Sequence, residues 1–167
     1  MSTWLTEAEY RTSGAAKLGL TLNTAFLQEI KEDHIEFRKL LEDVLVAFSQ
    51  KDPPTPKQAV DWLSRLRDAL ESYFALEEFY GYFKSSRTAN LAVSQRADKL
   101  RHEHHTLFVR LCELEDQAEQ ILYHETPITM AEVAEGLIAF YSQMREHEQR
   151  EMALMMELHN QVLGGGD

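Results

Sequence analysis

The stretch Ser142-Gln-Met-Arg-Glu-His-Glu-Gln-Arg-Glu-Met152, near the carboxyl end of the chain, decides how the rest is interpreted. His147 and Glu151 are four residues apart, so a helix stacks them on one face. The same face carries apolar side chains at helical spacing, namely Leu137, Phe140, Met144 and Leu154. We therefore expect an imidazole and a carboxylate to point into the core. A buried glutamate is costly unless positive charge meets it, which favours a bound cation.

The composition is that of a small acidic protein. A chain of 167 residues suits one domain with a substantial core. With 28 acidic and 17 basic residues the net charge is -11, which argues against partners such as nucleic acid or an anionic membrane surface. The chain has no apolar run of transmembrane length and no signal-peptide pattern at its start. The single cysteine, Cys112, excludes an internal disulfide and suits a reducing cytoplasm, so we expect a cytoplasmic protein.

Turn and cap residues divide the chain into helical segments. The first helix is predicted to start near Asn23 or Thr24, either of which can cap it, and to end at the prolines that follow Lys51. The second starts at Thr55-Pro56, which is an N-cap followed by proline at the first helical position. The third follows the polar connection at residues 84–90 and continues towards Leu122.

The fourth helix is predicted to begin after Thr129, which forms a capping box with Glu132, and to end near Asn160. Four long amphipathic segments with short connections predict an all-α fold, an up-down-up-down four-helix bundle. We expect the bundle at residues 23–163, an N-terminal arm laid over it at residues 1–22, and a flexible tail at residues 164–167.

The two halves of the chain align with each other. Ile30-Lys-Glu-Asp-His34 matches Leu100-Arg-His-Glu-His104, and Tyr73-Phe-Ala-Leu-Glu77 matches His147-Glu-Gln-Arg-Glu151. Each half thus has a helix with one core histidine, followed by a helix with a core aromatic or histidine and a core glutamate. A bundle would bring these side chains to one interior layer. The candidate metal ligands are His34, Tyr73, Glu77, His104, His147 and Glu151.

Imidazole and carboxylate groups from facing helices are how iron sites in bundle cores are built. Nitrogen and oxygen donors without thiolate favour iron, manganese or zinc over copper(I) or an iron–sulfur cluster. Two carboxylates that face each other across the core favour a pair of bridged cations.

Each candidate also has an ordinary interpretation. A core histidine can be a hydrogen-bonded packing residue, and a core glutamate can pair with an arginine such as Arg67, Arg145 or Arg150. The repeat-related positions favour metal binding over both. Tyr73 stays open between a phenolate ligand and a hydrogen-bond donor to a bridging oxygen or water. The remaining histidines are expected at or near the surface: His102, His105, His124 and His159.

With these residues placed, the chain resembles the hemerythrin-like family, the bacterial HHE cation-binding domains, over roughly residues 23–160. The family pattern is a histidine followed by His-x-x-x-Glu, repeated twice along four helices. The resemblance implies a non-haem site with two iron ions, oxo- or hydroxo-bridged. Glu77 and Glu151 would bridge, His104 and His147 would hold one iron, and His34 the other.

The sequence departs from the family at two positions. Oxygen-carrying hemerythrins have a further histidine one turn before His104, where this chain has Leu100. Tyr73 replaces the first histidine of the motif, and a phenolate there would favour Fe(III) over the diferrous state that O₂ carriage needs.

The leading hypothesis is a diiron protein that binds or senses O₂, peroxide or NO, or takes part in iron handling. The alternatives are a peroxide- or NO-consuming diiron enzyme and an interaction bundle that has lost its metal. The sequence leaves the oligomeric state open.

Overall fold

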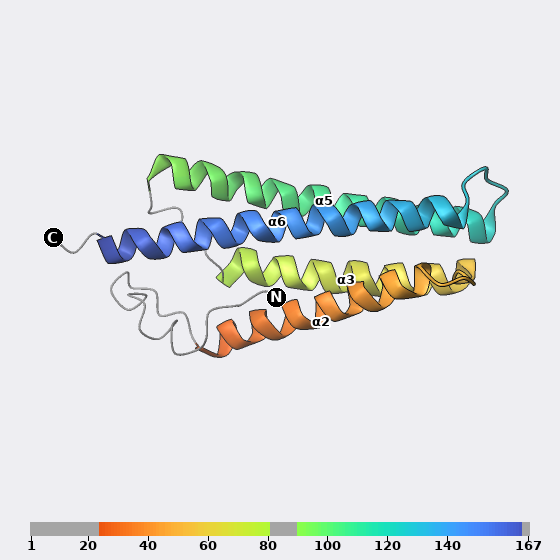
Figure 1. The fold of residues 1–167 in the computed structure, drawn as a ribbon, viewed down its shortest axis with the longest axis horizontal. Helices are drawn as coiled ribbons and strands as arrows, with labels where there is room; N and C mark the ends of the chain where they lie inside the picture. Colours follow the sequence, from red (N-terminus) through yellow and green to blue (C-terminus); the bar gives the residue numbers. More distant parts are fainter. Residues whose placement is uncertain (1–23, 81–89, 165–167) are drawn as a thin grey trace.

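The computed structural model describes residues 24–80 and 90–164, which form a bundle of four long α-helices (Figure 1). The helices are α2 (Thr24–Phe48), α3 (Pro56–Tyr80), α5 (Leu91–Tyr123) and α6 (Met130–Gly164). Helix α3 packs against both α2 and α5, and α6 packs mainly against α5, with a looser contact to α2. The predicted four-helix bundle is confirmed. The predicted arm, at residues 1–22, lies outside the described residues.

Capping boxes fix the starts of two helices. Before α3, the Gln58 amide donates to Thr55 Oγ1 at 3.3 Å, and the Thr55 amide donates to Gln58 Oε1 at 2.9 Å. Before α6, the Glu132 amide donates to Thr129 Oγ1 at 3.3 Å, and the Thr129 amide donates to Glu132 Oε2 at 2.7 Å. These reciprocal bonds satisfy amides that a helix start otherwise leaves unpaired, as predicted for Thr129.

The other boundaries agree with the sequence except at the carboxyl end. The Asn90 side chain caps α5 by accepting from the Val93 amide at 3.0 Å. Helix α6 continues to Gly164 and does not end near Asn160. Before the first glycine of the tail nothing interrupts the helix, and Leu158 packs against a buried apolar cluster in its last turns.

Two hydrophobic clusters lie on either side of a polar layer. The larger runs along all four helices and includes Phe37, Leu63, Leu107 and Phe140. The smaller holds Val93, Ala97, Leu100 and Leu154, so Leu100 is an ordinary packing residue here. Fully burying one such side chain stabilises the fold by about 1.5–3 kcal/mol. The clusters supply the packing that holds the helices together, so the polar layer between them is not needed for that packing.

A buried ion pair joins α3 and α5 within the larger cluster's half of the bundle. Glu115 is only 6% exposed, and Arg67 Nη1 donates to its Oε2 at 2.6 Å. Burial raises the pKa of Glu115, and the charge of Arg67 opposes that rise. Arg67 also contacts Ser64 and Asp68. This buried carboxylate is therefore met by a cation of the protein itself.

None of the helices in the described ranges combines the length and apolar character needed to cross a membrane.

The ion pair yields a stability prediction. Arg67→Met keeps an apolar stem but leaves Glu115 buried without a cation at pH 7. We expect the free energy of unfolding to fall by about 2 kcal/mol, less than for a fully buried pair because the Arg67 side chain is 31% exposed. Near pH 4, where the carboxyl of the unfolded chain is itself protonated, the loss should shrink.

Urea denaturation of metal-free protein at the two pH values measures both effects. Lys99→Met, at an exposed position on α5, is the control and should change stability by less than about 0.5 kcal/mol. A loss of the same size at pH 7 and pH 4 would contradict the assignment.

Candidate metal centre

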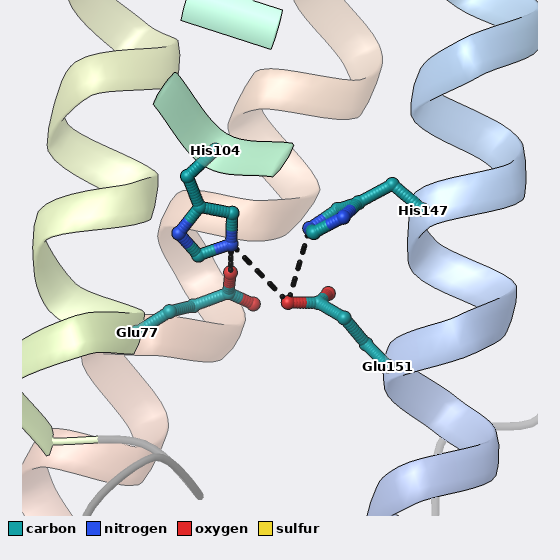
Figure 2. Close-up of side chains that lie close together, drawn as sticks. All are labelled: Glu77, His104, His147 and Glu151. Carbon is teal, nitrogen blue, oxygen red and sulfur yellow. Dashed lines mark hydrogen bonds and ion pairs between the residues drawn. The ribbon is translucent and has the colours of Figure 1, made fainter. Parts of the chain in front are cut away.

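Four buried side chains from three helices converge on one point in the polar layer (Figure 2). Glu77 comes from α3, His104 from α5, and His147 and Glu151 from α6. Each offers one ligand atom, and these four atoms all lie within 4.8 Å of one another. The side chains reach this point because each occupies a core position of its helix. Four of the six predicted ligands are thus brought together.

The distances within this group suit a shared cation. Glu151 Oε1 lies 3.3 Å from His104 Nε2 and 3.2 Å from His147 Nε2, and His104 Nε2 lies 3.4 Å from Glu77 Oε2. Donor atoms that each lie about 2.1 Å from one tetrahedral ion are themselves about 3.4 Å apart. The spacing is therefore close to that of a coordination shell.

Two of these atoms lack any aligned hydrogen bond. Glu77 Oε2 and His147 Nε2 are buried, and neither has a hydrogen-bond partner among the described residues. Their short contacts, to His104 and Glu151, have poor hydrogen-bond geometry. Buried polar atoms are rarely left in this way, and a cation at the centre would satisfy both. The residues present therefore fit a metal ion.

Protons take the place of a cation when no metal is bound. Burial and the charge of Glu151 raise the pKa of Glu77 to about 7. Burial also acts to raise the pKa of Glu151, but the close imidazoles of His104 and His147 outweigh it and lower that pKa to about 2. Burial disfavours charge on His104, yet the two carboxylates raise its pKa to about 10. The layer thus demands positive charge whatever supplies it.

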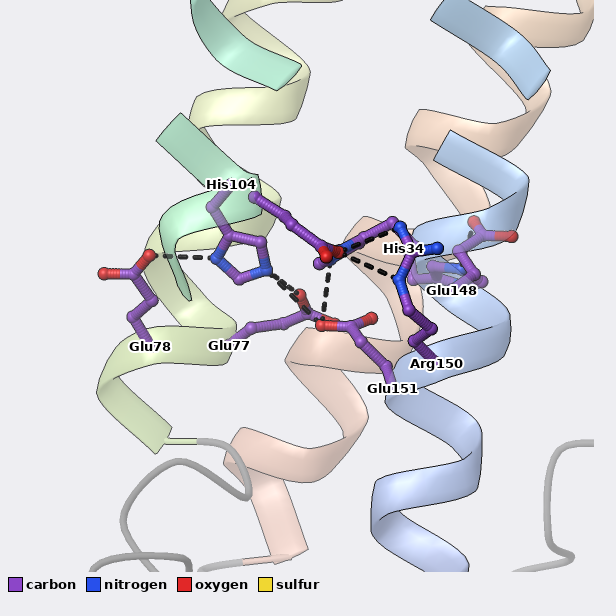
Figure 3. A network of polar contacts seen from close by, with 9 residues as sticks. His34, Glu77, Glu78, His104, Glu148, Arg150 and Glu151 are labelled. Atoms are coloured by element: carbon purple, nitrogen blue, oxygen red, sulfur yellow. Dashed lines mark hydrogen bonds and ion pairs between the residues drawn. The ribbon is translucent and has the colours of Figure 1, made fainter. Parts of the chain in front are cut away.

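The outer nitrogens of two histidines are held by carboxylates, and Figure 3 labels one such pair, His104 and Glu78. His104 Nδ1 lies 2.9 Å from Glu78 Oε1, and His147 Nδ1 lies 2.9 Å from Glu103 Oε2. Arg150 Nη2 in turn donates to Glu103 Oε2 at 3.0 Å. A carboxylate on Nδ1 fixes the tautomer in which Nε2 is free to bind a metal, and it makes that nitrogen more basic.

These carboxylates were not identified from the sequence. Glu78, Glu103 and Glu148 each stand directly beside a predicted ligand along the chain. A residue one position away points about 100° to the side on a helix, so the pattern indicates a surface residue. The available signal was their recurrence, since a glutamate adjoins Glu77, His104 and His147 alike.

His34 is not part of the four-atom group, and the ring of Tyr73 packs against that of His34. Both are buried, and their rings are 5.1 Å apart. His34 Nε2 lies 3.2 Å from Glu148 Oε1 on α6 (Figure 3). The Tyr73 hydroxyl has no hydrogen-bond partner of good geometry among the described residues. Burial, together with the charges of Glu77 and Glu151, raises its pKa well above 10, so the phenol is neutral.

Aromatic rings pack around the layer. Phe74 stacks on His104 with ring centroids 3.8 Å apart and an angle of 10° between the planes. The same ring meets His147 edge-on at 5.8 Å, and Phe37 stacks on Tyr73 at 5.8 Å. Phe74 follows Tyr73 directly and was not singled out in the sequence. It holds the imidazole plane of His104 in place.

Two of the three arginines considered as partners for the core glutamates pair with other residues. Arg67 pairs with Glu115 and Arg150 with Glu103, so these two arginines are engaged away from the core glutamates Glu77 and Glu151. The other histidines behave as expected where they are described, since His102, His105 and His124 are exposed. The side chain of His159 is outside the described part.

The family comparison agrees with this geometry. A family model described as the hemerythrin HHE cation-binding domain matches residues 25–159. The chain belongs to the hemerythrin family. The match spans nearly the whole of this hemerythrin bundle, which confirms the family assigned from the motif, and its description indicates cation binding. No curated protein and no solved structure matched the chain.

The carboxylate behind His147 yields a prediction for this hemerythrin site. Glu103→Gln keeps the shape but removes the charge that orients the imidazole. We expect metal affinity to fall about 10- to 100-fold, as for other outer carboxylates on metal-bound histidines. Competition with a chromophoric chelator measures it.

Glu113→Gln is the matched control, because Glu113 lies on the same helix and is exposed. It should leave metal affinity unchanged. Equal affinities for the Glu103→Gln variant and the unchanged protein would show that Glu103 has no orienting role.

Proposed function

We propose that this hemerythrin-family protein binds iron in the polar layer, up to two ions, and uses it to bind or sense O₂, peroxide or NO. The proposal rests on two buried atoms, Glu77 Oε2 and His147 Nε2, on either side of Glu151. Neither has a well-aligned hydrogen bond among the described residues. Nitrogen and oxygen donors without sulfur suit iron. The family description, a cation-binding domain, supports the same conclusion.

The ligand residues have distinct tasks in this proposal. Glu77 and Glu151 supply the negative charge that attracts a cation, while His104 and His147 supply Nε2 atoms that Glu78 and Glu103 orient. Bound iron would supply a Lewis-acidic, redox-active centre for a small oxygen or nitrogen species. His34 and Tyr73 complete the layer on the α2 and α3 side.

Tyr73 is better suited to donate a hydrogen bond than to act as a phenolate. Its hydroxyl is buried and neutral, and no aligned acceptor is in place for it within the described residues. Such a group can donate a hydrogen bond to a small molecule held beside it. Leaving the buried hydroxyl without a partner costs about 1–3 kcal/mol. The near-complete burial of the layer suits a ligand the size of a diatomic molecule or peroxide.

Removing one core carboxylate tests the metal site. Glu151→Ala should reduce the iron content to near zero after expression with iron, because it deletes half of the layer's negative charge. Elemental analysis of purified protein measures the content, and circular dichroism checks the fold.

Glu146→Ala is the control, since Glu146 is an exposed neighbour on α6. It should retain the iron of the unchanged protein. If the wild-type protein holds no iron after expression with iron, the proposed function is wrong.

Replacing Tyr73 tests the ligand-binding part. The reduced, iron-loaded protein should change its absorption spectrum on addition of NO, O₂ or peroxide. Tyr73→Phe should keep the iron content but release NO faster, by about tenfold for the loss of one hydrogen bond of about 1.4 kcal/mol. An intense visible band in the ferric protein that Tyr73→Phe abolishes would instead identify a phenolate ligand. A spectrum indifferent to all three ligands would reject this role.

A further inference from the structure

The two sides of the polar layer offer very different ligand sets. One side brings together two imidazole nitrogens and two carboxylate oxygens, from His104, His147, Glu77 and Glu151. Four protein donors are enough to complete the shell of a four-coordinate ion. This side is therefore complete before any other predicted ligand is used.

Among the described residues, the predicted ligands on the other side are His34 and Tyr73. His34 Nε2 is directed to Glu148 at 3.2 Å (Figure 3). Glu148 also lies 4.0 Å from Arg38 Nε. His34 would have to turn away from Glu148 to present that nitrogen to an ion. Tyr73 contributes a phenol where the repeat places an imidazole. Apart from Glu148, any further donor among the described residues would have to be shared with the complete side.

The buried charge also distinguishes a first ion from a second. Glu77 and Glu151 together carry two negative charges, which one divalent cation neutralises. A second divalent cation would bring two uncompensated positive charges into a layer that hydrophobic clusters enclose, and burying such charge is costly. Of the carboxylates outside the layer, Glu103 is already paired with Arg150, and Glu78 is more than a third exposed. Glu148, beside His34, lies 4.0 Å from Arg38 Nε and is met by that charge.

Building on the proposed metal site, we propose that its two positions are unequal and fill in order. The first divalent ion binds to Glu77, His104, His147 and Glu151. A second ion binds beside His34 and Tyr73 only when the free metal concentration is at least about 100-fold higher. Groups that orient metal ligands change metal affinity by up to about this factor. At limiting metal the protein therefore holds a single ion.

Titration of the metal-free, full-length chain with Mn²⁺ tests this order. Equilibrium dialysis counts the bound ions, and electron paramagnetic resonance distinguishes an isolated Mn²⁺ from a spin-coupled pair. The first equivalent should bind tightly and give the six-line signal of an isolated ion. The second should bind at least about 100-fold more weakly.

Tyr73→His restores the imidazole that the repeat places at this position. In this variant the second equivalent should bind within about tenfold of the first, and the isolated signal should give way to that of a coupled pair. Tyr73→Phe is the matched control, with the first affinity unchanged and the second no stronger than in the unchanged protein. Circular dichroism confirms that both variants fold.

The outcomes separate this inference from the function on which it rests. An unchanged protein that takes up two Mn²⁺ with comparable affinity overturns the ordered filling and leaves the metal site standing. An unchanged protein that takes up neither Mn²⁺ nor Fe²⁺ overturns the metal site, and the ordered filling with it. A Tyr73→His variant that folds but still binds its second ion as weakly as the unchanged protein overturns the part assigned to Tyr73.

Discussion

Two carboxylates buried in one layer of a helical core impose the constraint on which the rest of the site depends. Unit charges of the same sign about 5 Å apart repel by about 3 kcal/mol at the effective dielectric constant of protein sites. Glu77 and Glu151 lie in such a layer, with ligand atoms inside a 4.8 Å group. The facing imidazoles of His104 and His147 relieve the repulsion by holding protons, and a metal ion can replace those protons. Affinity for a cation is thus built into the electrostatics of the fold.

The bundle neutralises its buried carboxylates in two different ways. At Glu115 the partner is Arg67, a fixed cation whose pair with it ties α3 to α5. Beside the polar layer, Arg150 pairs with Glu103, which lies behind the imidazole of His147. The first arrangement neutralises a buried charge permanently. The second keeps the arginine outside the layer, so the protons that neutralise the layer can be replaced by a metal ion. The hydrophobic clusters on both sides make this possible because they hold the helices without help from the polar groups.

Helical periodicity predicted most of the fold and the burial of four candidate ligands. The period reports the direction of each Cβ, so Glu77, His104, His147 and Glu151 were placed on inward faces correctly. It does not report the rotamer, which is why the turn of His34 towards Glu148 could not be predicted. Glu78 and Glu103 point to the side of the same faces, so the pattern could not separate them from solvent-exposed residues. The stacking of Phe74 on His104 depends on how two helices approach, which only the folded chain determines.

The glutamates behind the histidines form, together with Glu77 and Glu151, a ring of negative charge around the layer. Each of these three glutamates, Glu78, Glu103 and Glu148, contacts an imidazole. Arg150 also pairs with Glu103, and Arg38 lies beside Glu148. Net charge near a redox-active metal is one of the factors that set its reduction potential. Surrounding negative charge stabilises the more highly charged oxidation state. The ring would therefore lower the reduction potential of a redox-active ion held inside it and so favour its oxidised form.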